Sequence, residues 1–247
     1  MAGTMSGIDV AAVLAIMGFG SFVYAVSGFG FALVSAPLLA LVLAPSRAVV
    51  LVSLASVASN IRFGALGFRD ADRALVLRLV VASLVGMPIG LVVIEHASAR
   101  GLRLVIGIAV AAIAAVMASG YRPRRAGMGT DVVAGFVSGV LNTSTGTNGP
   151  PLVIGLHARG IPPTRFRSTL AAVFFVTNVV AIALFATRGR VLGRDVALAV
   201  AVLPLQLAAW AIGSAVHRRL SAERFEKVTI ALLFASALAA IVGALRA

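Results

Sequence analysis

The decapeptide from Asn142 to Pro151 has the residue types of a binding site for a small anion. It reads Asn-Thr-Ser-Thr-Gly-Thr-Asn-Gly-Pro-Pro and interrupts an apolar stretch that runs from Val132 to Leu156. Its hydroxyl and amide groups can donate hydrogen bonds. A helix that restarts at the two prolines would also present unpaired N–H groups and the positive end of its dipole. A tight helix–helix crossing through small residues is the alternative, but two prolines and two asparagines fit such packing poorly.

The rest of the chain indicates that this segment lies inside a membrane. The 247 residues are 60% hydrophobic and only 12% charged, with a mean hydropathy of +1.06, whereas a soluble domain carries about a quarter charged residues. Hydrocarbon offers no water to unpaired backbone groups, so a broken segment at membrane depth is tolerated only inside protein or beside a cavity. Such breaks commonly form the substrate sites of secondary transporters.

Apolar blocks separated by short charged clusters indicate the fold class. Many of the blocks approach the roughly 20 residues that span a bilayer. Ser98, Asp131 and Ser221 are candidate helix caps. We therefore predict an all-α polytopic membrane protein with about 8–10 membrane segments. The blocks cover residues 9–27, 30–44, 48–66, 74–95, 102–119, 131–141, 149–157, 168–187, 195–216 and 227–245.

The charges and the missing motifs exclude several classes of function. The net charge of +13 comes from 21 Lys and Arg against eight acids. The basic residues fall between apolar blocks, where they suit anionic lipid headgroups rather than nucleic acid. All acids lie near block ends, so an acidic proton relay has no obvious carrier. The chain has no cysteine, Walker motif, H-E-x-x-H or G-x-S-x-G, so we expect no cofactor, no metal and no enzymatic activity.

The order of short motifs indicates an internal duplication. Pro45-Ser46-Arg47 recurs as Pro163-Thr164-Arg165, and Ser59-Asn60 recurs as Thr177-Asn178, both 118 residues further along. Matching motifs in the same order predict two related halves. The predicted units are a first transmembrane repeat at residues 1–120, a central loop at 121–130 and a second transmembrane repeat at 131–247.

The distribution of basic residues bears on how the two halves are related. If each half crosses the membrane four times, the two sides carry 10 and 11 basic residues, whereas an odd number of crossings gives 7 and 14. Cytoplasmic loops carry an excess of Lys and Arg, so the odd number is favoured. It requires each broken element to form two spans or a re-entrant hairpin, and it makes the repeats inverted with both termini outside. A parallel relation is the alternative.

A break in the first half and three polar residues complete the candidate site. The first break is Ser27-Gly28-Phe29-Gly30, followed by Pro37. Asn60 and Asn178 occupy equivalent positions inside apolar blocks, where they either contact the substrate or join helices. Arg62 either faces the anion as a counter-charge or snorkels to the headgroups. The predicted substrate-binding residues are Gly28, Gly30, Pro37, Asn60, Arg62, Thr143, Ser144, Thr145, Gly146, Thr147, Asn148, Gly149, Pro150, Asn178 and Gln206.

Three groups of motifs are similar to those of a known family. They are Gly28-Phe-Gly30 with Pro37-Leu-Leu39, the run Gly146-Thr-Asn-Gly-Pro-Pro-Leu152, and the stretch from His157 to Leu170 with Asn178 behind it. At these residues, and over nearly its whole length, the chain resembles the sulfite exporter TauE/SafE family of membrane permeases. The resemblance implies a secondary transporter that moves sulfite, sulfoacetate or other organosulfonates, usually outward, and works by alternating access.

The resemblance also implies a multi-pass protein of the bacterial inner membrane whose partners are a small anionic substrate and membrane lipid. A non-transporting membrane scaffold or assembly factor is the alternative function, and it would not need polar breaks inside apolar blocks. The identity of the anion, the direction of transport, a coupling ion and the oligomeric state are left open by the sequence.

Overall fold

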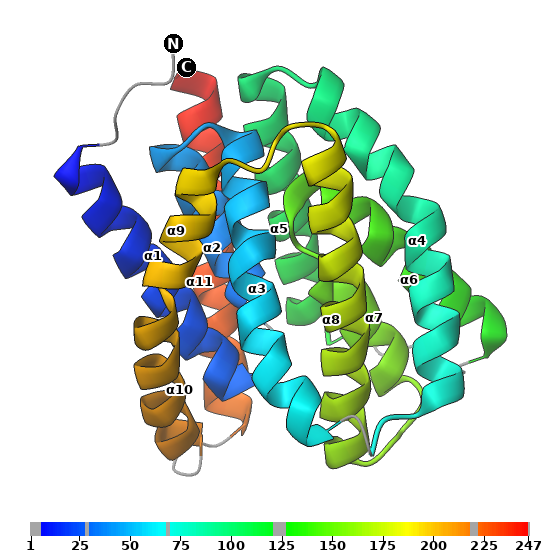
Figure 1. Ribbon diagram of the computed structural model, residues 1–247. Helices are drawn as coiled ribbons and strands as arrows, with labels where there is room; N and C mark the ends of the chain where they lie inside the picture. The colour runs from blue at the N-terminus through cyan, green and yellow to red at the C-terminus, as the bar shows by residue number, and fades with distance from the viewer. Residues whose placement is uncertain (1–5, 28–29, 68–69, 121–126, 218–221, 247) are drawn as a thin grey trace.

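The computed structural model describes residues 6–27, 30–67, 70–120, 127–217 and 222–246, and these residues are almost entirely helical (Figure 1). Side chains are described over the same ranges except at 27, 58–59, 61–67, 163, 210, 214–217 and 222–229. No strand occurs in the described ranges, so the all-α prediction is confirmed. The helices are α1 (Gly7–Ser27), α2 (Phe31–Val42), α3 (Pro45–Gly67), α4 (Arg73–His96), α5 (Ala99–Ala118), α6 (Met128–Thr145), α7 (Gly149–His157), α8 (Pro163–Thr187), α9 (Gly193–Ala201), α10 (Leu203–His217) and α11 (Ala222–Arg246).

The lengths of the helices divide them into two kinds. The stretches long and apolar enough to cross a bilayer contain 20 to 24 residues, close to the roughly 20 that hydrocarbon requires. By contrast, α2 has 12 residues and α7 has nine, too few to cross. Each follows one of the two predicted breaks, so each half begins with a long helix and a short one. The candidate spans are Gly7–Val26, Arg73–His96, Ala99–Ala118, Thr164–Thr187 and Gly193–Gly213.

The two halves pack against each other in a reciprocal pattern. In the first half α4 packs on α6 of the second half, and α10 of the second half packs on α1 of the first, while α3 contacts α8 and α5 contacts α11. Figure 1 shows the start of α1 and the end of α11 at the same end of the bundle, and its colours show that α3 and α8 run in opposite directions, as do α5 and α11. This pattern agrees with an inverted relation between the halves, which stays a prediction.

Glycines bring the backbones of α4 and α6 into direct contact. A Cβ atom at Gly139 of α6 would lie 1.9 Å from the carbonyl oxygen of Ser83, and one at Gly90 of α4 would lie 2.1 Å from that of Val140. The Ser83 hydroxyl also donates a hydrogen bond of 2.9 Å to the Gly135 carbonyl across the crossing. Close approach through small residues is a common way to join helices in membranes. It holds α6, which ends at the second break, firmly against α4.

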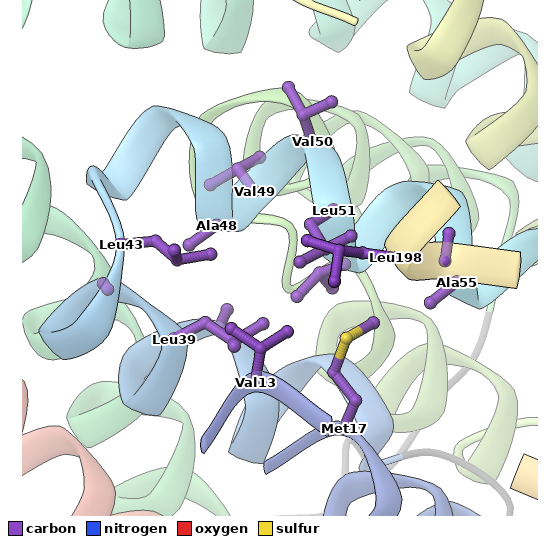
Figure 2. Packing of buried hydrophobic residues seen from close by; sticks show 14 of the residues in the cluster. Val13, Met17, Leu39, Leu43, Ala48, Val49, Val50, Leu51, Ala55 and Leu198 are labelled. Atoms are coloured by element: carbon purple, nitrogen blue, oxygen red, sulfur yellow. The ribbon is translucent and has the colours of Figure 1, made fainter. Parts of the chain in front are cut away.

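A buried apolar cluster holds the short helix α2 in place. Figure 2 shows Val13 and Met17 of α1 near Leu39 of α2, with Leu51 of α3 and Leu198 of α9 in the same cluster. The first four of these side chains are fully buried. Lipid tails are as apolar as these side chains, so close van der Waals packing is what favours this arrangement. The cluster fixes the helix that follows the first break.

The apolar block at 195–216 forms two helices that meet at Val202. Pro204 is the second residue of α10 and has no N–H to bond the carbonyl four residues earlier, so the regular ladder is interrupted. The N–H of Val202 still donates to the Leu198 carbonyl, and the N–H of Gln206 donates to the Val202 carbonyl. The two short helices therefore continue one another as a single apolar stretch of bilayer length.

Candidate substrate-binding site

The second break is shorter than the decapeptide that marks it in the sequence. Helix α6 continues through Thr145, and only residues 146–148 lie outside a helix. The hydroxyls of Ser144 and Thr145 donate to carbonyls four residues earlier in α6, at 2.7 and 2.9 Å, so these polar residues remain compatible with helix. Gly146 then ends the helix with a φ of 74°, a left-handed conformation that glycine adopts without strain.

The start of α7 offers fewer backbone donors than the sequence suggests. Its first three residues are Gly149, Pro150 and Pro151, and proline has no N–H. Only the N–H of Gly149 is therefore available among these three positions. The side chain of the preceding residue, Asn148, does not cap the helix, and its amide nitrogen reaches the Thr177 hydroxyl only at 3.5 Å. An anion at this helix start would depend on side-chain donors as much as on the backbone.

The first break separates α1 from α2 and contains a glycine directly before α2. Gly30 precedes α2 with a φ of 133°, a conformation that side chains disfavour. Gly28 lies outside the described residues. Pro37 lies inside α2 and is buried in the helix bundle, away from the cavity described next.

The two breaks meet at one small cavity whose lining residues are mostly buried. Its volume is about 30 Å³, enough for about two water molecules at roughly 10–15 Å³ each. Among the described residues, no charged side chain lines it. The lining residues are Tyr24, Gly30, Phe31, Ala32, Leu33, Ser56, Asn60, Asn148, Gly149, Phe174 and Asn178.

Five predicted residues line this cavity together, although they come from four separate parts of the chain: Gly30, Asn60, Asn148, Gly149 and Asn178. Helices α3 and α8, which pack on each other, carry the two equivalent asparagines. The breaks before α2 and α7 supply the others. The predicted duplication, which stays a prediction, would place one of these asparagines on each side of the same space.

A tyrosine that the sequence did not single out orients one of these asparagines. The Tyr24 hydroxyl donates a hydrogen bond of 2.8 Å to Oδ1 of Asn60, and both side chains are buried. An amide whose oxygen is engaged presents its NH2 group as the remaining donor. Tyr24 is one of only two tyrosines in the chain and lies within an apolar block, which could have identified it in advance.

Several other predicted residues do not belong to the cavity lining. The Thr143 hydroxyl donates to the Met87 carbonyl at 2.7 Å and so belongs to the crossing of α4 and α6. Thr145 and Thr147 contact each other through their hydroxyl oxygens, 2.6 Å apart. The amide nitrogen of Gln206 donates to the Ala55 carbonyl at 3.2 Å, which links α10 to α3 beside the cavity.

The other positions have different surroundings. Ser144 bonds within its own helix, Gly146 is the helix cap, and Pro150 borders an apolar groove between α5, α6 and α7. The side chain of Arg62 lies outside the described residues. Its two predicted roles, as a counter-charge to the anion or as a residue that reaches the lipid headgroups, therefore both stay predictions.

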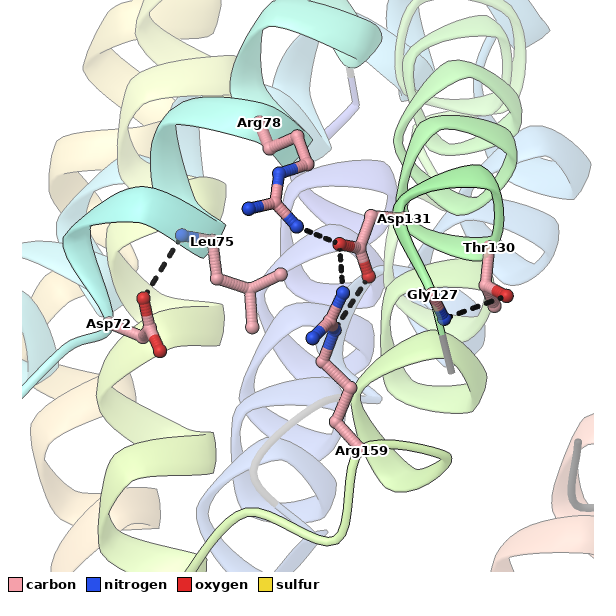
Figure 3. Close-up of polar contacts among 7 residues, drawn as sticks. All are labelled: Asp72, Leu75, Arg78, Gly127, Thr130, Asp131 and Arg159. Atoms are coloured by element: carbon pink, nitrogen blue, oxygen red, sulfur yellow. Dashed lines mark hydrogen bonds and ion pairs between the residues drawn. The ribbon is translucent and has the colours of Figure 1, made fainter. Parts of the chain in front are cut away.

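Buried ion pairs lie at the ends of helices rather than at the cavity. Figure 3 shows Asp131 between Arg78 of α4 and Arg159 in the turn after α7, with distances of 2.7 and 2.8 Å from nitrogen to carboxylate oxygen. The hydrogen bonds that Arg159 donates to the Asp131 carboxylate raise the pKa of Arg159 above its usual value. Asp131 lies in the first turn of α6 and not at its cap, which is Gly127, so the predicted capping role is wrong. Arg47 and Asp195 form a second pair, at 2.6 Å.

The protein is a helical bundle with candidate membrane spans, and two short helices start at one small cavity that three asparagines line. These features are those of a multi-pass membrane protein of the permease class. The chain belongs to the family described as Sulfite exporter TauE/SafE, whose family model matches residues 12–240. No curated protein and no solved structure matches the chain. The family assignment confirms the resemblance seen in the motifs. It indicates a membrane transporter of sulfite or related sulfur anions, a function that requires no enzymatic activity.

Proposed function

We propose that this protein is a secondary transporter that exports small sulfur-containing anions, sulfite or organosulfonates, by alternating access around the cavity between the two breaks. The observation that carries the proposal is the convergence of Asn60, Asn148 and Asn178 on one buried space together with the glycines of both breaks. An amide can donate to an oxyanion without carrying a charge. Neutral donors bind an anion while allowing its release, which a transporter requires.

The size of the cavity bears on the conformation. About 30 Å³ holds roughly two water molecules, which is less than an anion of four heavy atoms fills. The described conformation is therefore a constricted one, and the proposed cycle needs the walls to separate before the substrate enters. The tight crossing of α4 and α6 joins the two halves at that point, so the walls of the cavity must separate through movement of other helices relative to this pair.

The charge distribution supports an orientation for the proposed transporter. With an odd number of crossings per half, 14 of the 21 basic residues fall on the side opposite the termini. Cytoplasmic surfaces carry the basic excess, so the turn between α5 and α6 faces the cytoplasm and both termini face outward. Basic loops on that side would raise the local concentration of an anion before export.

The proposal is tested by flux in vesicles that contain the purified protein. Vesicles loaded with radiolabelled sulfite should lose the label faster than protein-free vesicles, and unlabelled sulfonates should compete, whereas carboxylates should compete less. A matched control is Thr187→Val, because the Thr187 hydroxyl is exposed, bonds only the Leu184 carbonyl and is remote from the cavity. A well-folded protein that moves neither sulfite nor sulfonates would refute the proposal and favour the scaffold alternative.

A further inference from the structure

The second half of the protein holds a buried amide that has no partner. Asn142 of α6 is completely buried, and neither its Oδ1 nor its Nδ2 atom forms a hydrogen bond. A buried polar group without a partner loses its hydration and receives nothing in exchange, so it destabilises the fold. Most such groups in native proteins are satisfied. The unsatisfied amide of Asn142 therefore requires a physical reason.

The duplication assigns Asn142 a counterpart in the first half. The same spacing that relates Asn60 to Asn178 also relates Tyr24 to Asn142. In the first half, Tyr24 reaches its asparagine and bonds it at 2.8 Å. In the second half, the shorter Asn142 stands where the tyrosine would, and neither Asn142 nor Asn178 forms a side-chain hydrogen bond in the described part of the chain. In the first half one amide oxygen is therefore engaged and only the Asn60 NH2 group remains, whereas in the second half two whole amides are without a side-chain partner.

The neighbours of Asn142 on its helix show where the side chain points. Ser138 and Thr145 lie four residues before and three residues after it, on the same helical face. The Ser138 hydroxyl donates to the Asn148 carbonyl at 2.7 Å, and the Thr145 hydroxyl contacts that of Thr147 at 2.6 Å. Both bonds lead from this face of α6 into the break. Asn142 is thus directed toward the segment that borders the cavity, although it does not line the cavity in this conformation.

We propose that Asn142 and Asn178 form a two-amide clamp that binds the oxygens of the anion once the cavity widens. The inference rests on the proposed transport function and names the wall that receives the substrate. An anion with several oxygens on one sulfur atom can accept from both NH2 groups at once, as a sulfite or a sulfonate head group does. The first half offers the single NH2 group of Asn60, whose oxygen is held by Tyr24, so the second half supplies the larger share of the amide donors. On this proposal, Asn142 has no protein partner because its amide serves the substrate.

The test compares stability and affinity in the Asn142→Leu variant. Leucine removes both unpaired polar atoms at a similar volume. We expect the thermal unfolding midpoint of the substrate-free protein to rise by about 2–4 °C, while calorimetry shows sulfite binding at least tenfold weaker. The matched control is Ser35→Ala in α2, because the Ser35 hydroxyl is also buried without a partner but lies against Gly20 rather than at the break. Its sulfite affinity should not change.

Each outcome separates the clamp from the broader function. If Asn142→Leu binds sulfite like the parent while Asn148→Ala binds it weakly, the clamp is wrong and the proposed function stands. If Asn142→Leu lowers both the midpoint and the affinity, Asn142 is a structural amide and the clamp is also wrong. If the parent binds neither sulfite nor sulfonate, both proposals fail. Should the leucine variant not fold, Asn142→Ser is judged by the same two measurements.

Discussion

The Asn148→Ala substitution isolates one donor of the cavity with little effect on the fold. Asn148 is 6% exposed, and its amide nitrogen has only a marginal contact with Thr177, at 3.5 Å. Removing the side chain should therefore change the free energy of unfolding by less than about 1 kcal/mol. With the anion bound, the same deletion removes a hydrogen bond to a charged group, worth about 1.5–3 kcal/mol. The dissociation constant should rise roughly tenfold to a hundredfold.

Isothermal titration calorimetry with sulfite and an organosulfonate measures this change on the purified protein. The informative control is Thr145→Val, which keeps the shape of the side chain three residues earlier. The Thr145 hydroxyl donates to the Leu141 carbonyl and contacts Thr147, but it does not line the cavity. This variant should lose up to about 1 kcal/mol of unfolding free energy and keep the affinity of the parent.

Two results would contradict this reasoning. If Asn148→Ala binds both anions like the parent protein, the amide is not a ligand and the cavity loses its main side-chain donor at the second break. If Asn148→Ala and Thr145→Val weaken binding equally, the loss comes from a changed conformation of the break rather than from a missing contact. Thermal unfolding of both variants distinguishes this second case from simple destabilisation.

Three further predictions concern the scaffold. Gly139→Ala forces a methyl group against the backbone of α4 and should lower the free energy of unfolding by about 1–3 kcal/mol or more, whereas Gly129→Ala, with open space around it, should not; thermal unfolding would measure both. Asp131→Asn removes the partner of two partly exposed arginines and should lower that free energy by about 1.5–3 kcal/mol; an unchanged unfolding midpoint would show that the ion pairs contribute no net stability. A single cysteine in place of Gly127 should resist an impermeant reagent in intact cells, while one in place of Ser6 should react; the reverse pattern would mean the opposite orientation.

The helices could be located from the sequence because the membrane restricts what the chain can do there. Hydrocarbon requires long apolar stretches with internally paired backbones, so the block at 74–95 corresponds closely to α4 (Arg73–His96). The two breaks were also predictable, because glycine and proline mark them directly. The division of 195–216 was not, although Pro204 was visible, because proline does not always end a helix: α4 continues through Pro88. Neighbouring packing decides between the two outcomes.

The candidate site could be predicted only in part. Asn60 and Asn178 are visible because an amide in an apolar block is unusual and the duplication repeats it. The partners of a hydroxyl are not visible, because they depend on which helix lies alongside. Thr143 looked like a ligand in the sequence, but its hydroxyl bonds the Met87 carbonyl of α4, more than 50 residues away along the chain. Tyr24 was overlooked for the converse reason: its role depends on contact with α3.

Among the described side chains, the ion pairs lie at helix ends and the cavity lining is uncharged, which is consistent with the proposed transport of an anion. The described ion pairs of Asp131 and Asp195 lie near helix ends, where their arginine partners are partly exposed. A permanent cation deep in the low-dielectric interior would hold an anion strongly and slow its release. Amides and hydroxyls replace less of the hydration that the anion loses on binding than a cation does. They therefore favour weak binding that the next conformational change can reverse. On this view, the basic surface concentrates the substrate and the asparagines select it.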